Sequence, residues 1–115
     1  METLRYTIED YDTVRVINLN GNISNATKND LARMVHGLAA KGNVIINLKG
    51  VEMVTSSGIN TLMKLSVDCR QKGKRLLLLG VKDGVRRMID VLDYYDYFIV
   101  VDSVEEGQRK LDHYL

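Results

Sequence analysis

Cysteine, proline and tryptophan are scarce in this sequence of 115 residues, which contains one cysteine and neither of the other two. Cys69 has no second cysteine with which to form an internal disulfide, so a cytoplasmic location is expected. No apolar run approaches the ~20 residues of a membrane span, and no basic segment followed by an apolar one stands at the N-terminus. We therefore expect no membrane contact and no secretion signal.

An excess of charge of either sign is also missing. Sixteen Lys and Arg residues against fifteen Asp and Glu residues give a formal net charge of +1. A nucleic-acid-binding protein would need an excess of basic residues on one face, so we expect no nucleic acid among the partners. Apolar residues make up 45% of the chain and charged residues 27%, which is ordinary for a folded domain. The sequence has no repeats, linkers or low-complexity tracts, so residues 1–115 are expected to form a single domain.

Two runs of alternating apolar and polar residues open the chain. They cover residues 4–8 and 14–19 and are separated by a turn-like polar segment. This period of two predicts a β-hairpin. Gly21 follows the second run, where it is expected to allow a tight bend or a bulge.

Helical patterns alternate with short apolar runs in the rest of the chain. The spacing predicts helices from Ser24 or Asn25 to about Lys41, from about Ser57 to Lys72, over Asp83–Leu92 and from Ser103 onward, and strands at Val44–Leu48, Leu76–Leu79 and Phe98–Val101. A strand, a helix and a strand within about 35 residues form a parallel crossover unit. The order β-β-α-β-α-β-α-β-α therefore predicts an α/β fold, with a mixed, mostly parallel sheet of about five strands and about four helices packed on it.

Three adjacent hydroxyl residues, Thr55, Ser56 and Ser57, stand where the strand Val44–Leu48 has ended and a helix is about to start. The first N–H groups of a helix have no partner within the helix, and the helix dipole leaves partial positive charge there. Such a site accepts an anion readily. One interpretation is that Thr55 or Ser56 only caps the helix, and spacing alone favours it. The other is that Ser57 or its neighbour carries a phosphate as a regulatory switch.

The whole chain resembles a STAS domain, the fold of bacterial anti-sigma factor antagonists. Ser56-Ser57-Gly58-Ile59, after an apolar strand, resembles the Asp-Ser-Ser-Gly-aliphatic signature of that family. Val14–Asn22 resembles its early strand, which ends in a glycine turn. Lys74–Gly80 and Asp83–Leu92 resemble the strand and helix that follow the signature.

The resemblance implies a regulatory switch. In that family an anti-sigma factor that is also a serine kinase, of the histidine-kinase-like ATPase type, phosphorylates a serine of the signature. Only the unmodified protein binds this kinase and so releases a sigma factor. The acceptor maps onto Ser57, with Ser56 and Thr55 as alternatives. Thr55 replaces the aspartate of the family signature, and Asn22 and Ser24 replace acidic residues of the glycine turn, so this chain has less negative charge there.

The expected partner surface combines the loop of residues 49–57, the first turns of the helix after it and the turn of residues 21–25. Its members are Gly21, Asn22, Ser24, Asn25, Met53, Thr55, Ser56, Ser57, Gly58, Asn60 and Thr61. The protein itself is expected to be a monomer or a weak dimer.

Two other functions stay open. A serine enzyme would need a base near its nucleophile, but His36 lies mid-helix, His113 lies in the last turn, and Ser57 is not in a Gly-x-Ser-x-Gly elbow. A glycine-rich phosphate loop followed by lysine is also missing, so we expect no catalytic residue, no cofactor and no metal. The other alternative is an accessory subunit of a larger complex, stressosome-like or lipid-transporting, in which the same loop docks without being modified.

Overall fold

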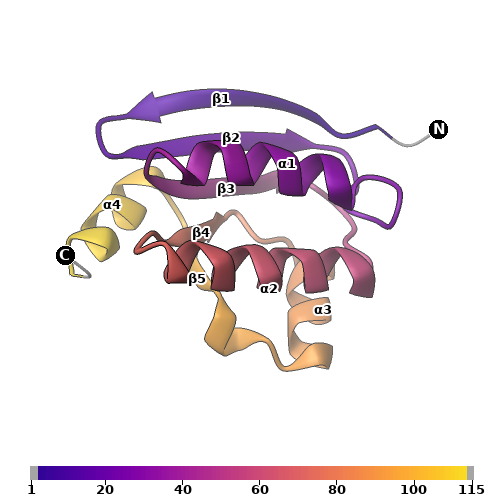
Figure 1. The fold of residues 1–115 in the computed structure, drawn as a ribbon. Coiled ribbons are helices and arrows are strands. Elements are labelled where there is room, and N and C mark those ends of the chain that lie inside the picture. The colour runs from indigo at the N-terminus through magenta and orange to yellow at the C-terminus, as the bar shows by residue number, and fades with distance from the viewer. Residues whose placement is uncertain (1–2, 114–115) are drawn as a thin grey trace.

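The structure, a computed structural model, describes residues 3–113, so the outermost residues of the predicted domain lie outside the described part. The strands are β1 (Arg5–Tyr11), β2 (Val14–Asn20), β3 (Asn43–Gly50), β4 (Leu76–Leu79) and β5 (Ile99–Val101). The helices are α1 (Lys28–Ala39), α2 (Ser56–Gln71), α3 (Asp83–Leu92) and α4 (Val104–Asp112), with a short 3-10 helix, η1 (Tyr95–Tyr97), before β5. The predicted element order and fold class are confirmed (Figure 1).

The five strands form one mixed sheet in the order β1-β2-β3-β4-β5. β1 and β2 form the predicted antiparallel hairpin, in which Tyr11 lies opposite Val14. All other neighbours are parallel, because each is reached through a helical crossover. β3 lies at the centre and β1 lies at an edge.

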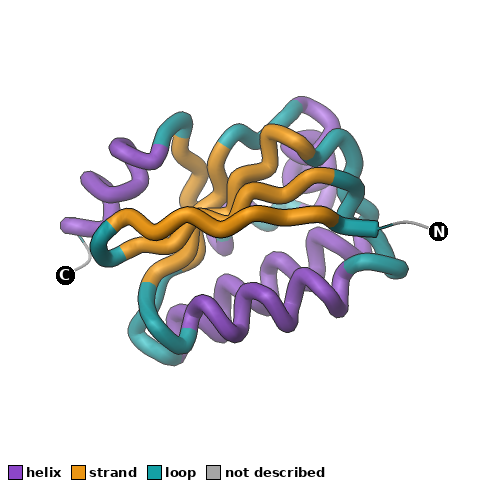
Figure 2. The backbone as a smooth tube through the Cα atoms, turned by 90° about the horizontal axis from the view of Figure 1, so that it is seen from above, coloured by secondary structure: helices purple, strands orange, loops and turns teal. Residues whose placement is uncertain are grey.

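Helices cover both faces of this sheet. Figure 2 looks down on the β1 edge and shows α1 and α2 on one side of the strands and α4 on the other. Val44 and Ile46 of β3 belong to the larger core with α1, α2 and α3, whereas Ile45 between them belongs to a smaller cluster with Leu111 of α4. A strand that is covered on both faces needs consecutive apolar residues, which explains why β3 reads as an unbroken apolar run.

The first helix starts later than its pattern predicts. Instead of beginning at Ser24 or Asn25, α1 begins at Lys28. The carbonyl of Ser24 accepts hydrogen bonds from the N–H groups of Thr27 (3.1 Å) and Lys28 (2.9 Å), and the Thr27 hydroxyl accepts one from the N–H of Ser24 (2.9 Å). These bonds close a separate turn before the helix, because Ser and Thr side chains compete with helical hydrogen bonds for the backbone.

The glycine after β2 makes the bend that the sequence predicts. Gly21 has a φ of 128°, and a Cβ atom there would lie 2.8 Å from the carbonyl oxygen of Thr3. The pairing of β2 with β3 shifts register between Asn18 and Asn20, just before this bend. This shift in register and the bend at Gly21 end β2, and the chain then continues beside the C-terminal end of β3.

None of the helices in residues 3–113 combines the length and the hydropathy that crossing a membrane requires.

Candidate functional site

Two loops that are distant in sequence lie side by side at the C-terminal ends of β2 and β3. Ile23 and Val54 form an isolated parallel bridge. The N–H of Ile23 donates to the carbonyl of Met53 (3.1 Å), and the N–H of Thr55 donates to the carbonyl of Ile23 (2.9 Å). The turn after β2 is therefore fixed directly beside the start of α2, as the partner-surface hypothesis requires.

Thr55 is the cap of α2. It has an extended backbone conformation, and its hydroxyl oxygen accepts a hydrogen bond from the N–H of Gly58 (3.1 Å). Its carbonyl accepts the first helical hydrogen bond, from Ile59 (2.9 Å). The capping interpretation is thus confirmed for Thr55, while Ser56 is already the first residue of the helix. The next two N–H groups, of Ser56 and Ser57, belong to the helix start that has no acceptor within the helix.

Ser57 lies where the two loops meet. Its hydroxyl donates a weak hydrogen bond to Oδ1 of Asn25 at 3.4 Å, which is longer than the usual range of about 2.5–3.0 Å for a bond between two oxygens. The side chain is partly exposed, and the neighbouring Ser56 is exposed. Both hydroxyls are therefore accessible to another molecule. The first turn of α2 contains no acidic residue, so no carboxylate in this turn would repel a phosphate group.

The expected surface residues divide by exposure. Asn22, Asn25, Met53 and Ser56 are exposed, Gly21, Thr55, Ser57, Asn60 and Thr61 are partly exposed, and Ser24 and Gly58 are buried. Met53 is 61% exposed, so its apolar side chain is open to contact by another molecule. Ser24 is only 8% exposed, and its hydroxyl accepts a hydrogen bond from the N–H of Ala26 (3.2 Å), so this side chain supports the turn rather than offering a contact.

Gly58 has a packing role. A Cβ atom at this position would lie 2.7 Å from the carbonyl oxygen of Ile23 and 3.0 Å from Cγ1 of Val54. The absence of a side chain at Gly58 therefore lets the first turn of α2 approach the Ile23–Val54 bridge. This close approach brings Ser57 within reach of Asn25.

Two contacts connect the expected surface to residues outside it, Lys82 and Tyr94. Glu52 forms an ion pair with Lys82, which connects the loop to the start of α3. The Tyr94 hydroxyl donates a hydrogen bond to Oδ1 of Asn60 (2.7 Å) and so connects α2 to the segment that follows α3. The two residues of the first pair are 30 positions apart in the sequence and those of the second pair are 34 apart, so no local sequence motif contains both members of either pair.

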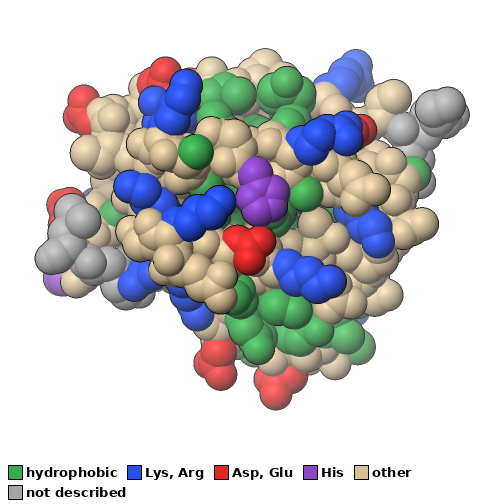
Figure 3. Space-filling model, in the orientation of Figure 1, with side chains coloured by type: hydrophobic (Ala, Val, Ile, Leu, Met, Phe, Trp, Pro, Cys, Tyr) green, Lys and Arg blue, Asp and Glu red, His purple; other side chains and the backbone are tan. Residues whose placement is uncertain are grey.

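A shallow groove of about 280 Å³ lies between α1 and α2. Its lining includes Lys28, His36 and Lys64, together with Thr61, whose hydroxyl donates to the carbonyl of Ser57 (3.1 Å). Nε2 of His36 lies 3.9 Å from a carboxylate oxygen of Asp68. Figure 3 shows histidine, acidic and basic side chains along this side of the molecule, over α1 and α2.

The groups with shifted pKa values lie away from Ser57. Burial raises the pKa of the Cys69 thiol, which sits about three turns further along α2. A hydrogen bond to Glu9 raises the pKa of the Tyr11 hydroxyl, at the opposite end of the β1–β2 hairpin. His36 contacts Asp68, also about three turns from Ser57, which leaves it poorly placed as a base for that hydroxyl. Within residues 3–113, no group of three or more His, Cys, Asp or Glu side chains is arranged to hold a metal ion.

The comparisons with known proteins agree with this architecture. A family model described as the STAS domain matches residues 5–107, which is most of the chain. The chain belongs to the STAS domain family.

Among solved structures, this STAS domain is similar to an anti-sigma factor antagonist from Mycobacterium paratuberculosis, with a TM-score of 0.77 and 19% identity over 94% of this chain and 93% of that one. It is also similar to the unphosphorylated form of the anti-sigma factor antagonist SpoIIAA, with a TM-score of 0.75 and 16% identity over 94% of this chain and 97% of that one. The phosphorylated form of SpoIIAA, from Bacillus, gives a TM-score of 0.68 and 14% identity over 91% and 98% of the two chains.

The chain is also similar to part of SLC26A9, with a TM-score of 0.76 and 17% identity. It covers 90% of this STAS domain but only 21% of the much longer SLC26A9 chain. At these identities the likenesses show the shared fold. The question of function therefore returns to the residues at the start of α2.

Proposed function

We propose that this STAS domain is an anti-sigma factor antagonist that binds an anti-sigma factor with serine kinase activity, and that phosphorylation of Ser57 prevents this binding. The supporting observation is the position of Ser57. Its hydroxyl is partly exposed at the start of an α-helix and bonded across to Asn25, while Thr55 caps the helix separately. The protein acts in this proposal as a binding module and not as an enzyme.

A phosphate at Ser57 is compatible with the fold. It adds about −1.5 to −2 charges at neutral pH, with three strong acceptor oxygens. The N–H groups and the dipole at the start of α2 favour a negative group by roughly 0.3–1 kcal/mol. Within residues 3–113, the long hydrogen bond to Asn25 is the side-chain contact that the modified hydroxyl would lose, so the cost to stability is small.

The same phosphate is costly at a protein interface. Asn25 in the turn after β2, Met53 in the loop before α2 and Ser56 at the first position of α2 surround the Ser57 position in sequence and fold, and all three of these side chains are exposed. A partner that covers this surface removes water from the phosphate, and an unpaired charge there costs several kcal/mol. A loss of about 2.8 kcal/mol already weakens binding a hundredfold. The switch can therefore act on association and leave the fold intact.

Ser57 is a better acceptor than its neighbours on structural grounds. A phosphate on Thr55 would disturb the hydroxyl that caps α2 through Gly58. Ser56 is exposed and remains the alternative, but Ser57 is the hydroxyl that reaches across to Asn25 in the turn after β2. In the family that this chain resembles, the second serine of the pair is also the usual acceptor.

The first experiment identifies the acceptor. The protein is incubated with ATP and with candidate serine kinases of the histidine-kinase-like ATPase type, and its intact mass is measured. We expect the gain of one phosphate, which Ser57→Ala abolishes and Ser56→Ala preserves. Incorporation that survives in Ser57→Ala would contradict the assignment of Ser57.

The second experiment measures binding to the same kinase. Ser57→Asp should raise the dissociation constant at least tenfold, which corresponds to about 1.4 kcal/mol, while the unfolding midpoint changes little. Gln71→Glu is the matched control, because it adds the same charge at the exposed far end of α2, about 21 Å from Ser57 along the helix. An equal effect of both variants would show a response to total charge and would contradict the switch.

One alternative function has specific support. Thr55 and the rest of the first turn of α2 have no negative charge, and the fold also occurs within the much longer SLC26A9 chain. A docking subunit that uses the same surface without modification would bind its partner but gain no phosphate from any candidate kinase.

A further inference from the structure

The outer edge of β1 is an unusually open part of the molecule. All seven residues of β1 are exposed, and the strand pairs only with β2 on its inner side. Figure 2 shows β1 along the edge of the sheet, with the helices on either side of the strands rather than beyond this edge. An exposed edge offers unpaired N–H and C=O groups to another strand.

β1 has few of the features that normally protect an edge. Proteins block such strands with charged side chains, above all lysine, or with proline, a bulge or a covering segment. Three of the seven residues of β1 are charged. β1 contains neither proline nor lysine, and its pairing with β2 is continuous from Arg5 to Tyr11. Tyr6 and Ile8 are 49% and 45% exposed on the same side of the strand. The edge is thus long, regular and partly apolar.

We propose that β1 is the contact surface for a second copy of this chain. The two β1 strands pair antiparallel about a two-fold axis at Thr7, which joins the two five-stranded sheets into one sheet of ten strands. This contact is separate from the Ser57 surface and does not depend on the proposed function.

The charges of β1 select this register. When Thr7 lies opposite Thr7 of the second copy, Arg5 lies opposite Glu9, and Glu9 lies opposite Arg5. On the other side of the strand, Tyr6 then lies opposite Ile8. Opposite charges and aromatic–aliphatic pairs both stabilise antiparallel strands when they face each other directly.

Neighbouring registers lack this complementarity. A two-fold axis normal to the sheet places each side chain and its symmetry mate on the same face of the sheet. Such an axis can therefore pass through a residue position but not between two residues. An axis at Ile8 places Arg5 opposite Tyr11 and Glu9 opposite Thr7. An axis at Glu9 places the two carboxylates opposite each other, which is destabilising.

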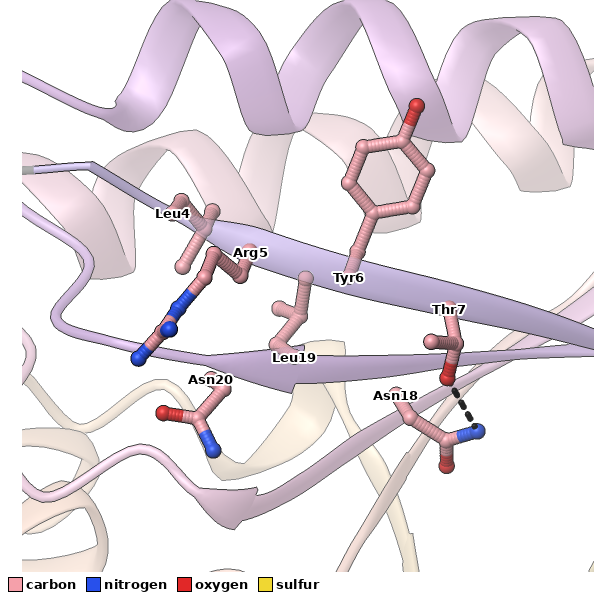
Figure 4. Close-up of a pocket in the computed structure, with 7 residues that line it drawn as sticks. All are labelled: Leu4, Arg5, Tyr6, Thr7, Asn18, Leu19 and Asn20. Carbon is pink, nitrogen blue, oxygen red and sulfur yellow. Dashed lines mark hydrogen bonds between the residues drawn. The ribbon is translucent and has the colours of Figure 1, made fainter.

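Glu9 is already held in place, whereas Arg5 is available. Glu9 accepts hydrogen bonds from Nδ2 of Asn18 (2.8 Å) and from the Tyr11 hydroxyl (3.1 Å). Among residues 3–113, Arg5 has no ion-pair partner. Figure 4 shows Arg5 and Thr7 on one side of β1 and Tyr6 on the other. The second copy would supply the missing partner of Arg5.

An open depression of about 650 Å³ lies along the β1–β2 hairpin. Leu4, Tyr6 and Leu19 form its apolar part (Figure 4). In the proposed register, Ile8 of the second copy lies opposite Tyr6 and so reaches the rim of this depression. The contact involves one strand from each copy, which is less than a stable interface needs, so a weak, concentration-dependent dimer is expected.

Charge reversal tests the register. Sedimentation of the protein over a wide concentration range should show a reversible monomer–dimer equilibrium. Arg5→Glu and Glu9→Arg each place like charges opposite each other twice, so each variant alone should dimerise at least tenfold more weakly. An equimolar mixture of the two variants restores both opposite-charge pairs and should dimerise again. Far-UV circular dichroism checks that each variant is folded.

A disulfide at the proposed axis is the second test. In this register the Cα atoms of the two Thr7 residues are about 4.5–5.5 Å apart, which is within the range that a disulfide spans. The two Arg5 residues are about 13 Å apart, because four residues of strand separate them. Thr7→Cys should therefore form a covalent dimer on oxidation, and Arg5→Cys should not. The native Cys69 is buried and does not compete.

Three outcomes would overturn the proposal. One is a protein that stays monomeric at millimolar concentration. Another is a mixture of charge variants that dimerises no better than either variant alone. The third is equal cross-linking of Thr7→Cys and Arg5→Cys, which would indicate random collision of exposed strands.

Discussion

Thr55, Ser56 and Ser57 are adjacent in the sequence but have three different environments. The Thr55 hydroxyl is engaged by the N–H of Gly58, the Ser56 side chain is exposed, and the Ser57 hydroxyl reaches across to Asn25. One residue therefore stabilises the helix, and another is left accessible to a partner or a kinase. This division lets a modification at the site affect binding more than folding.

The cap can be measured by substitution. Thr55→Ala removes the acceptor for the N–H of Gly58 and should lower the free energy of unfolding by about 1 kcal/mol. Thr55→Ser retains the hydroxyl and should be nearly neutral. Ser56→Ala removes an exposed hydroxyl that makes no cap and is the matched control. Urea unfolding monitored by circular dichroism gives the three values, and equal losses in Thr55→Ala and Ser56→Ala would contradict the assignment of the cap.

At the level of single residues, the sequence predicted a hydroxyl cap at the start of α2 but not the contacts around it. A hydroxyl before an apolar helical pattern indicates a cap, yet Thr55 and Ser56 are equally suitable by spacing alone. The hydrogen bond between Ser57 and Asn25 joins residues 32 apart, and the one between Tyr94 and Asn60 joins residues 34 apart. Such contacts depend on how the elements pack, which local periodicity does not encode.

At the level of elements, the approach of α2 to the turn after β2 depends on Gly58. The same turn holds Ile23 against Val54 through backbone hydrogen bonds on both sides. A helix and a bridge can lie this close only when no side chain separates them. The geometry of the partner surface is therefore set by the packing of this glycine.

Two glycine substitutions in helices should have opposite effects. Gly58→Ala places a Cβ atom 2.7 Å from the Ile23 carbonyl oxygen, so we expect a loss of about 1–3 kcal/mol from overpacking. Gly37→Ala in α1 meets no atom within 4 Å, so the higher helix propensity of alanine should stabilise the protein by about 0.5–1 kcal/mol. Urea unfolding midpoints measure both effects. Stabilisation by Gly58→Ala would show that the helix can move away from the bridge without cost.

The element order could be predicted because each strand and helix has a clear period, but the helix starts could not all be placed. The helix predicted from Ser103 onward starts as expected, because Ser103 caps α4 and its hydroxyl accepts a hydrogen bond from the N–H of Glu106 (3.0 Å). The Glu106 carboxylate accepts a hydrogen bond from the N–H of Asp102 (3.2 Å). In a standard capping box it would accept one from the N–H of the cap residue, Ser103. α1 started late because Thr27 closed a competing turn.

At the level of the whole molecule, the two faces of the sheet are covered unequally. The larger core includes buried residues from α1, α2 and α3, whereas α4 alone packs on the other face and buries only Gly107 and Leu111. Elements with few buried contacts open more readily than the rest of a structure. We therefore expect α4 to detach from the sheet at a lower free energy than global unfolding requires.

Amide hydrogen exchange of two variants distinguishes local from global opening. Leu62→Ala, in the larger core, should destabilise the native state by about 2–5 kcal/mol and accelerate exchange in β3. It should leave exchange in α4 almost unchanged. The substitution raises the free energy of the native state and of the state with α4 detached by the same amount, so the free energy of detaching α4 stays the same. Leu111→Ala removes the main contact of α4 and should accelerate exchange in both elements. If β3 and α4 responded identically to Leu62→Ala, the molecule would have to open as one unit, and the weaker docking of α4 would have no consequence for its dynamics.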